Sequence, residues 1–144
     1  MNQDYIFHRR LRMSVSDVVV AWADPRVMSE WFWPHIDGVS YDLPRRGRGD
    51  AYRISSASTG VTISGTCLHW DQHGFDLTWR VDGADFVQEG LDTLSVRLLP
   101  IEGEGCELVL TYAVNSNIAE HLTRMWDPTL DRLAALQITT ERVA

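Results

Sequence analysis

Apolar and polar residues alternate through the middle of the chain, from Val39 to Val114, and this pattern restricts the fold more than any other feature. Successive side chains of a strand point to opposite faces, so the alternation predicts a sheet with one apolar face and one wet face. Short, turn-like connections separate the alternating segments and make them antiparallel neighbours. We expect strands near 39–43, 50–56, 61–70, 75–81, 91–99 and 106–114.

The N-terminal part predicts one more strand and two short helices. Residues 5–13 alternate in the same way. Ser14 suits the N-cap of a helix, with Asp17 in its first turn. The pair Asp24-Pro25 suits the N-cap and first position of a second helix. The expected order is therefore a strand, two short helices and then the alternating region.

A stripe of leucines and one tryptophan at three- and four-residue spacing predicts a long helix over 118–141, in which Pro128 either kinks the helix or begins a new one. Wrapping the sheet around this helix is the economical way to bury both apolar surfaces. The predicted class is α+β with a helix-grip fold, a curved antiparallel sheet of about seven strands around the C-terminal helix. We expect a single domain, 1–144, with an interior cavity.

Charge and composition exclude several classes of function. The net charge of −7 disfavours nucleic-acid binding, and the absence of lysine excludes a Schiff-base mechanism. The cluster Arg45, Arg46 and Arg48 is most simply a solvated turn. The sequence has no apolar run of about 20 residues and no signal-peptide pattern at its start, so we expect a cytoplasmic protein without a membrane span.

The cysteines and histidines do not predict a metal site. Cys67 and Cys106 are far apart and are expected to be buried, reduced thiols. The histidines lack metal-ligand spacing, because His69 and His73 fall in a strand and turn rather than on one helix face. We therefore expect neither a metal nor a cofactor.

Five short motifs, in this order, resemble those of one known family. They are Ala21-Trp22-Ala23-Asp24-Pro25, Trp31-Phe32-Trp33-Pro34, Gly49-Asp50-Ala51-Tyr52-Arg53, the stretch from Gly65 to Trp79, and Trp126 with Leu130 and Leu133. The chain resembles the SRPBCC superfamily, which is START-related and birch-pollen-allergen-like. Within it, the chain is most similar to the group of the C-terminal domain of the activator of heat-shock protein ninety ATPase.

The resemblance covers nearly the whole chain, with a few departures. Met125 stands where the family usually has glycine, and His69 stands where it usually has an acidic residue. Met13-Ser14 replaces an alanine-proline turn, and Pro128 is an unusual insertion. The resemblance implies the helix-grip fold. It does not fix a function, because the fold serves carriers, enzymes and co-chaperones.

Tryptophans and inward-facing polar residues are the candidates for a binding site. We expect a small apolar or aromatic ligand to bind in the cavity, where some of the same side chains also form the core. Arg9, His69 and Tyr112 share the parity of apolar neighbours, so each should either have a partner in the protein or orient a ligand. The predicted ligand-binding residues are Trp31, Trp79, Trp126, Tyr112, His69, Arg9, Phe75, Leu77 and Met125.

Two other functions stay open at this point. The family resemblance suggests a stress-related, co-chaperone-like module that contacts a chaperone, although the chain has no room for the N-terminal domain of the eukaryotic co-activators. An enzyme of the cyclase or hydrolase type would use His69, Tyr112 or Arg9 to position or protonate a substrate. No catalytic motif supports that reading.

Four large apolar residues lie near expected strand ends or loops, without a place in the predicted core. They are Trp33, Trp70, Phe86 and Val87. If they are exposed together, they form a patch that a two-fold homodimer would bury. The alternative is that they fold over the cavity mouth as a lid.

Overall fold

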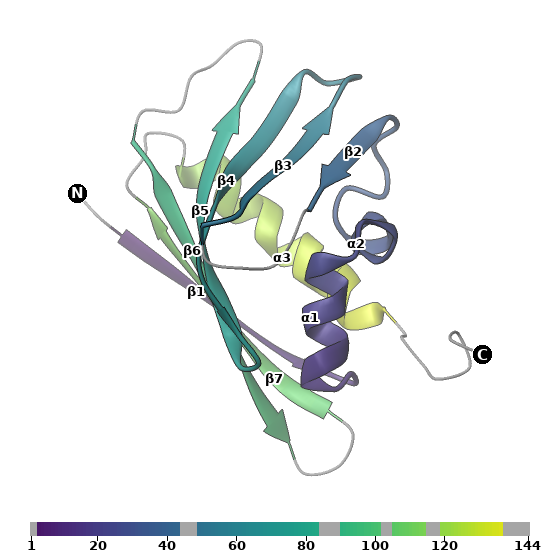
Figure 1. The fold of residues 1–144 in the computed structure, drawn as a ribbon, viewed down its shortest axis with the longest axis vertical. Helices are drawn as coiled ribbons and strands as arrows, with labels where there is room; N and C mark the ends of the chain where they lie inside the picture. The colour runs from purple at the N-terminus through teal and green to yellow at the C-terminus, as the bar shows by residue number, and fades with distance from the viewer. Residues whose placement is uncertain (1–2, 44–48, 84–89, 102–104, 115–118, 137–144) are drawn as a thin grey trace.

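The computed structural model describes residues 3–43, 49–83, 90–101, 105–114 and 119–136, and in the last helix it describes side chains from residue 125 onward. A curved antiparallel sheet forms one layer, and the helices lie on one side of it (Figure 1). This is the predicted α+β helix-grip fold. In the described part, none of the helices is long and apolar enough to cross a membrane.

The sheet has seven strands in the order β1-β7-β6-β5-β4-β3-β2, and every neighbouring pair is antiparallel. Strands β2 to β7 follow one another along the chain with short connections, while β1 adds to β7 at the far edge. The strands are β1 (Gln3–Leu11), β2 (Val39–Asp42), β3 (Ala51–Ser56), β4 (Val61–Asp71), β5 (Gly74–Asp82), β6 (Asp92–Ile101) and β7 (Gly105–Val114).

The helices are α1 (Val15–Ala23), α2 (Pro25–Trp31) and α3 (Ala119–Ala135). Both predicted N-caps are present. Ser14 Oγ accepts a hydrogen bond from the Asp17 amide, and Asp24 Oδ1 accepts one from the Arg26 amide. These caps fix where α1 and α2 begin, and so place Trp22 and Trp31 over the sheet.

Alternate residues of β5, β6 and β7 form the buried face of the sheet, as the pattern predicts. Trp126, Leu130 and Leu133 of α3 lie against this interior and are fully buried. The buried face of these strands consists of Phe75, Leu77, Trp79, Val81, Leu94, Val96, Leu98, Leu108, Leu110, Tyr112 and Val114.

The bounds of each strand differ from the expected ones by one or two residues, and the first strand and the last helix show how. The first strand ends at Leu11 rather than Met13, although Met13 is still buried, in the turn before the Ser14 cap. The last helix runs through Pro128 without a break, so the alternative of a separate helix starting there is wrong. Pro128 lies on the exposed side of α3. The helix ends at Ala135, so its predicted extension is wrong at Leu136, and residues 137–141 lie outside the described part.

The condition for the apolar patch, joint exposure of its four residues, is not met by the two that can be placed. Trp33 is only 8% exposed, and its ring centroid lies 5.3 Å from that of Phe32. Its φ of 58° is unusual for a residue other than glycine, and this backbone turns the side chain into the core. Trp70 is partly buried and stacks on Phe75 at 4.4 Å. Phe86 and Val87 lie outside the described residues.

Candidate functional site

A dense cluster of aromatic rings fills the interior between the sheet and α3. Trp31 and Trp126, two of the predicted binding residues, are both fully buried in it. The ring of Trp126 lies 5.2 Å from Trp79 and 6.1 Å from Trp22, and Trp22 lies 4.9 Å from Trp31. Such distances are those of packed aromatic pairs. Trp31 and Trp126 are therefore core residues in this structure.

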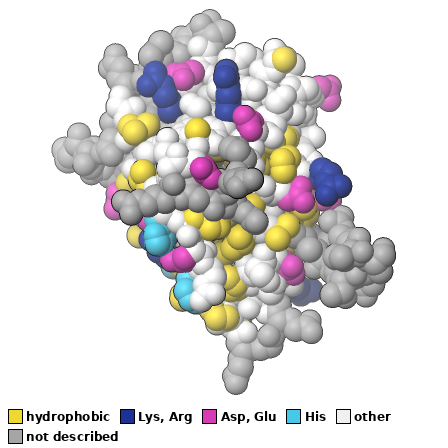
Figure 2. All heavy atoms as spheres, in the orientation of Figure 1, with side chains coloured by type: hydrophobic (Ala, Val, Ile, Leu, Met, Phe, Trp, Pro, Cys, Tyr) yellow, Lys and Arg dark blue, Asp and Glu magenta, His cyan; other side chains and the backbone are white. Residues whose placement is uncertain are grey.

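A cavity of about 50 Å³ lies beside this cluster, between the α1–α2 region and strands β3, β4 and β5. Figure 2 shows hydrophobic side chains gathered in the centre of one face of the molecule, with acidic side chains around them. The cavity is lined by Trp22, Ala23, Met28, Leu43, Asp50, Ala51, Tyr52, Ile54, Cys67, Trp70, Leu77 and Trp79. We call it the Trp79 pocket. Of the predicted binding residues, Leu77 and Trp79 line it.

The wall of the Trp79 pocket carries an indole donor without a partner among the described residues. Trp22 is 4% exposed, and its Nε1 has no hydrogen-bond partner among the described residues. Trp31 contrasts with it, because its Nε1 donates to the Ala21 carbonyl oxygen at 2.9 Å. A buried donor without a partner costs free energy, so the Trp22 indole is suited to an acceptor on a ligand.

Tyr52 also lines the Trp79 pocket, and its ring centroid lies 6.0 Å from that of Trp79. Its hydroxyl donates to the Thr78 carbonyl oxygen, and burial raises the pKa of the phenol well above its usual value. Gly65 makes this crossing over β4 possible, because a Cβ there would lie 2.7 Å from the Tyr52 hydroxyl and 2.0 Å from the Thr78 oxygen. The Tyr52 ring is therefore fixed, and its hydroxyl is already engaged.

Asp50 supplies the carboxylate in the pocket lining, and it is partly buried. Two backbone hydrogen bonds hold it beside Cys67: the Cys67 amide donates to the Asp50 carbonyl, and the Gly49 amide donates to the Cys67 carbonyl. Burial raises the pKa of the Cys67 thiol, and the negative charges of Asp50 and Asp76 add to the increase. Cys67 is thus a neutral thiol at ordinary pH.

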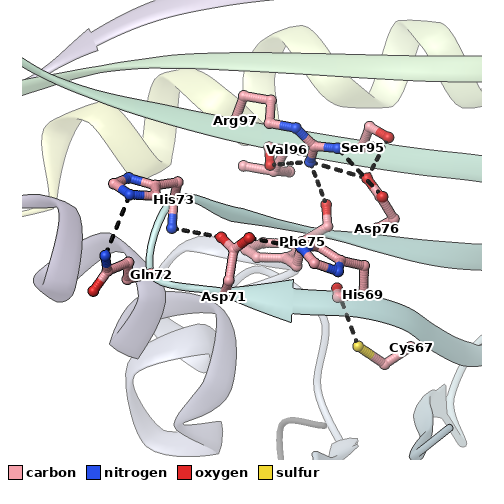
Figure 3. Close-up of polar contacts among 10 residues, drawn as sticks. All are labelled: Cys67, His69, Asp71, Gln72, His73, Phe75, Asp76, Ser95, Val96 and Arg97. Atoms are coloured by element: carbon pink, nitrogen blue, oxygen red, sulfur yellow. Dashed lines mark hydrogen bonds and ion pairs between the residues drawn. The ribbon is translucent and has the colours of Figure 1, made fainter. Parts of the chain in front are cut away.

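His69 does not point toward the interior, and the predicted inward orientation is wrong. The register between β4 and β5 shifts between Cys67 and His69, which reverses the faces of the following residues. Trp70 therefore turns inward, and the His69 side chain is 53% exposed on the outer face. There His69 Nε2 lies 2.6 Å from Asp71 Oδ2, and Asp76 binds Arg97 and Ser95 close by (Figure 3).

Arg9 is engaged at the edge of the sheet rather than in the pocket. Its guanidinium lies 2.9 Å from Asp127 and 3.1 Å from Asp131, both on α3, and it also donates to the His8 carbonyl. This is the carboxylate partner that the sequence reading allowed as an alternative to a ligand. Arg9 thus links β1 to the last helix.

Tyr112 has a partner that the sequence analysis did not identify. Its hydroxyl donates to Asp92 Oδ2 at 2.6 Å, and both residues are fully buried. Burial, the hydrogen bond and the Asp92 charge all raise the pKa of Tyr112. Asp92 is the first residue of β6, and it shares the parity of the buried residues Leu94 and Val96. This parity could have predicted from the sequence that Asp92 faces the interior.

Phe75 and Met125 pack in or against the core and do not line the Trp79 pocket.

Neither cysteine forms a disulfide, and both are buried. Within the described ranges, no group of three or more histidine, cysteine, aspartate or glutamate side chains could hold a metal ion.

Comparisons with known proteins support the fold. No protein-family model and no curated protein matches the chain. The structure of Mll3558 from Rhizobium loti matches with a TM-score of 0.75 and 20% identity, over 94% of this chain and 96% of that one. The AHSA1 protein of Silicibacter pomeroyi matches with a TM-score of 0.68 and 16% identity, over 92% and 96%.

CalU16 from Micromonospora echinospora is a third structural match. Its TM-score is 0.65 and its identity is 24%, over 92% of this chain and 74% of that one. These likenesses show the fold, which is the predicted helix-grip fold.

Proposed function

We propose that the protein binds a small apolar or aromatic molecule, one end of which enters the Trp79 pocket. The observation that carries this proposal is a cavity lined almost entirely by apolar and aromatic side chains, with the unsatisfied Trp22 indole as a polar handle. Apolar walls with a few placed polar groups are typical of ligand sites.

The volume of the cavity limits how much of the ligand it encloses. A cavity of about 150 Å³ accommodates benzene, and the Trp79 pocket has about one third of that volume, near 50 Å³. Only the end of a ligand fits inside. The remainder would lie at the mouth, where Ala51 is exposed and Leu43 and Trp70 are partly buried.

The geometry of the Trp79 pocket favours ligand binding over catalysis. Tyr112 and Arg9 are engaged with Asp92 and with the acidic residues of α3, and His69 lies on the outer face. The polar groups that an enzyme reading would use are therefore directed away from the Trp79 pocket.

The test is a thermal-shift and tryptophan-fluorescence screen of flat apolar compounds, including flavonoids, polyketides and fatty acids. A ligand that binds only the folded state raises Tm. At a ligand concentration of one hundred times Kd, it stabilises the folded protein by about 2.7 kcal/mol. Ala51→Trp should block the mouth and abolish the shift. Ala135→Trp adds the same ring at an exposed position on α3, far from the pocket lining, and should retain it. Equal loss in both variants, or no hit at all, would refute the proposal.

A further inference from the structure

The Trp79 pocket has one carboxylate in its lining, and this group selects the kind of ligand. Among the described lining residues, the ionisable side chains are Asp50, Tyr52 and Cys67. Tyr52 and Cys67 are neutral, because burial raises the pKa of each. Among the described residues, the Asp50 carboxylate has no side-chain hydrogen-bond or ion-pair partner. This inference rests on the proposed function and names its ligand class.

Aromatic side chains line the pocket together with this carboxylate. Trp22, Trp70, Trp79 and Tyr52 all line the pocket. The face of an aromatic ring carries negative electrostatic potential and attracts a cation, most strongly when the ring is indole and the site is shielded from water. Trp22 and Trp79 are 4% and 1% exposed, so both indoles are shielded from water.

The size of the pocket also suits a compact cationic group. A cavity of about 50 Å³ has one third of the volume that accommodates the six carbons of benzene, so it encloses about two methyl-sized groups. The leading methyl groups of a trimethylammonium head fit inside it, and the rest of the head would lie at the mouth. We propose that the Trp79 pocket selects organic cations, namely methylated amines and quaternary ammonium compounds with a short apolar body, through Asp50 and the surrounding indole rings.

Long-range electrostatics favour the same class of ligand. The chain carries a net charge of −7, which raises the local concentration of cations. Arg45, Arg46 and Arg48 precede Asp50 in sequence, and they lie in segment 44–48, outside the described residues. An anionic ligand held by these arginines is therefore the competing outcome, and the experiment includes a probe for it.

The experiment compares three probes in calorimetric or fluorescence titrations, each with a benzene ring and a head of three methyl groups. Phenyltrimethylammonium carries the positive charge, tert-butylbenzene is its uncharged carbon isostere, and 4-tert-butylbenzoate carries a negative charge. Phenyltrimethylammonium should bind about tenfold more tightly than tert-butylbenzene. Its affinity should fall as salt is added, because the Asp50 charge is only partly buried.

Two aspartate variants with the same change in net charge locate the effect. Asp50→Asn keeps the backbone hydrogen bonds to Cys67 and should reduce phenyltrimethylammonium binding to the level of the isostere. Asp4→Asn, at an exposed position on β1, should leave binding unchanged. A fall of equal size in both variants would overturn the role of Asp50.

The outcomes separate this inference from the proposed function. Binding of tert-butylbenzene or 4-tert-butylbenzoate with equal or greater affinity overturns the selection of cations and leaves the apolar pocket standing. If none of the three probes binds but another apolar compound from the screen does, the cation inference alone fails. If neither the probes nor the screen gives binding, both fail.

Discussion

The interior of the sheet has two halves that use the same residue types in different ways. In the filled half, Trp31 and Trp126 pack with Leu130 and Leu133 of α3, and all four are fully buried. In the open half, Trp22 and Trp79 reach the wall of the Trp79 pocket. Tryptophan on the apolar face of a sheet therefore does not by itself indicate a binding site.

The difference between the halves follows from what lies opposite the tryptophans. In the filled half, α3 supplies large side chains that occupy the space between sheet and helix. In the open half, the lining includes the small residues Ala23, Ala51 and Cys67, which leave volume between the larger rings. Small residues opposite aromatic ones are thus the feature that separates a pocket from a core.

The largest expected loss in the free energy of unfolding comes from removing an aromatic ring from the filled half. Trp126→Ala should lower the free energy of unfolding by about 3–5 kcal/mol, because it leaves a cavity in a close-packed region. Trp70→Ala, in the open half, should cost about half as much or less, since the Trp70 ring is only partly buried. Chemical denaturation measures both. Equal losses would remove the distinction between the two halves.

A smaller effect is expected at the buried polar pair of the interior. Tyr112→Phe removes the hydrogen bond to the Asp92 carboxylate and should cost about 1–3 kcal/mol in urea denaturation. Tyr5→Phe is the matched control, because Tyr5 is the β1 register partner of Tyr112 and is only partly buried. Its effect should stay within about 0.5 kcal/mol. A Tyr112→Phe protein as stable as the control would mean that the pair contributes nothing.

The smallest expected effect on stability concerns the Asp71 carboxylate. Asp71 lies at the β4–β5 turn, next to the exposed His69. The His69 hydrogen bond, together with the His73 amide, lowers the pKa of Asp71 below its usual value. A lowered folded-state pKa contributes stability above the unfolded value of about 3.9, and this stability is lost as the pH falls through the folded value. His69→Gln should raise the Asp71 pKa in an NMR titration of the carboxyl carbon.

His8→Gln is the control for this titration, since His8 lies on β1 beside Glu107. It should leave the Asp71 pKa unchanged. An Asp71 pKa that is the same in the His69→Gln protein and in the unaltered protein would show that the imidazole does not stabilise this carboxylate.

Alternation and capping signals were enough to predict the fold. The parity of β5, β6 and β7 identified the buried face, and Ser14 and Asp24 identified the two helix starts. These signals are local, since each depends on residues within one turn or one strand. The antiparallel order followed from short connections, which leave few topologies to choose from.

The candidate site was harder to predict, because it depends on where the register changes. One irregularity in β4 turns His69 outward and Trp70 inward, and simple alternation assigns both to the wrong face. Tyr52 and Asp50 belonged to a motif that supported the fold, yet their place in the pocket depends on contacts with β4 and β5. Gly65, which allows Tyr52 to cross β4, was the available signal.

The most direct test of this account is an indole N–H NMR titration. Each of the six tryptophans gives one indole signal, which single Trp→Phe variants assign. Phenyltrimethylammonium and tert-butylbenzene are each titrated into the protein, so that the result does not depend on the charge of the ligand. We predict the largest shifts at Trp22, Trp70 and Trp79, which line the pocket. Largest shifts at Trp31 and Trp126, or no shifts with either probe, would contradict the assignment of the open half as the binding region.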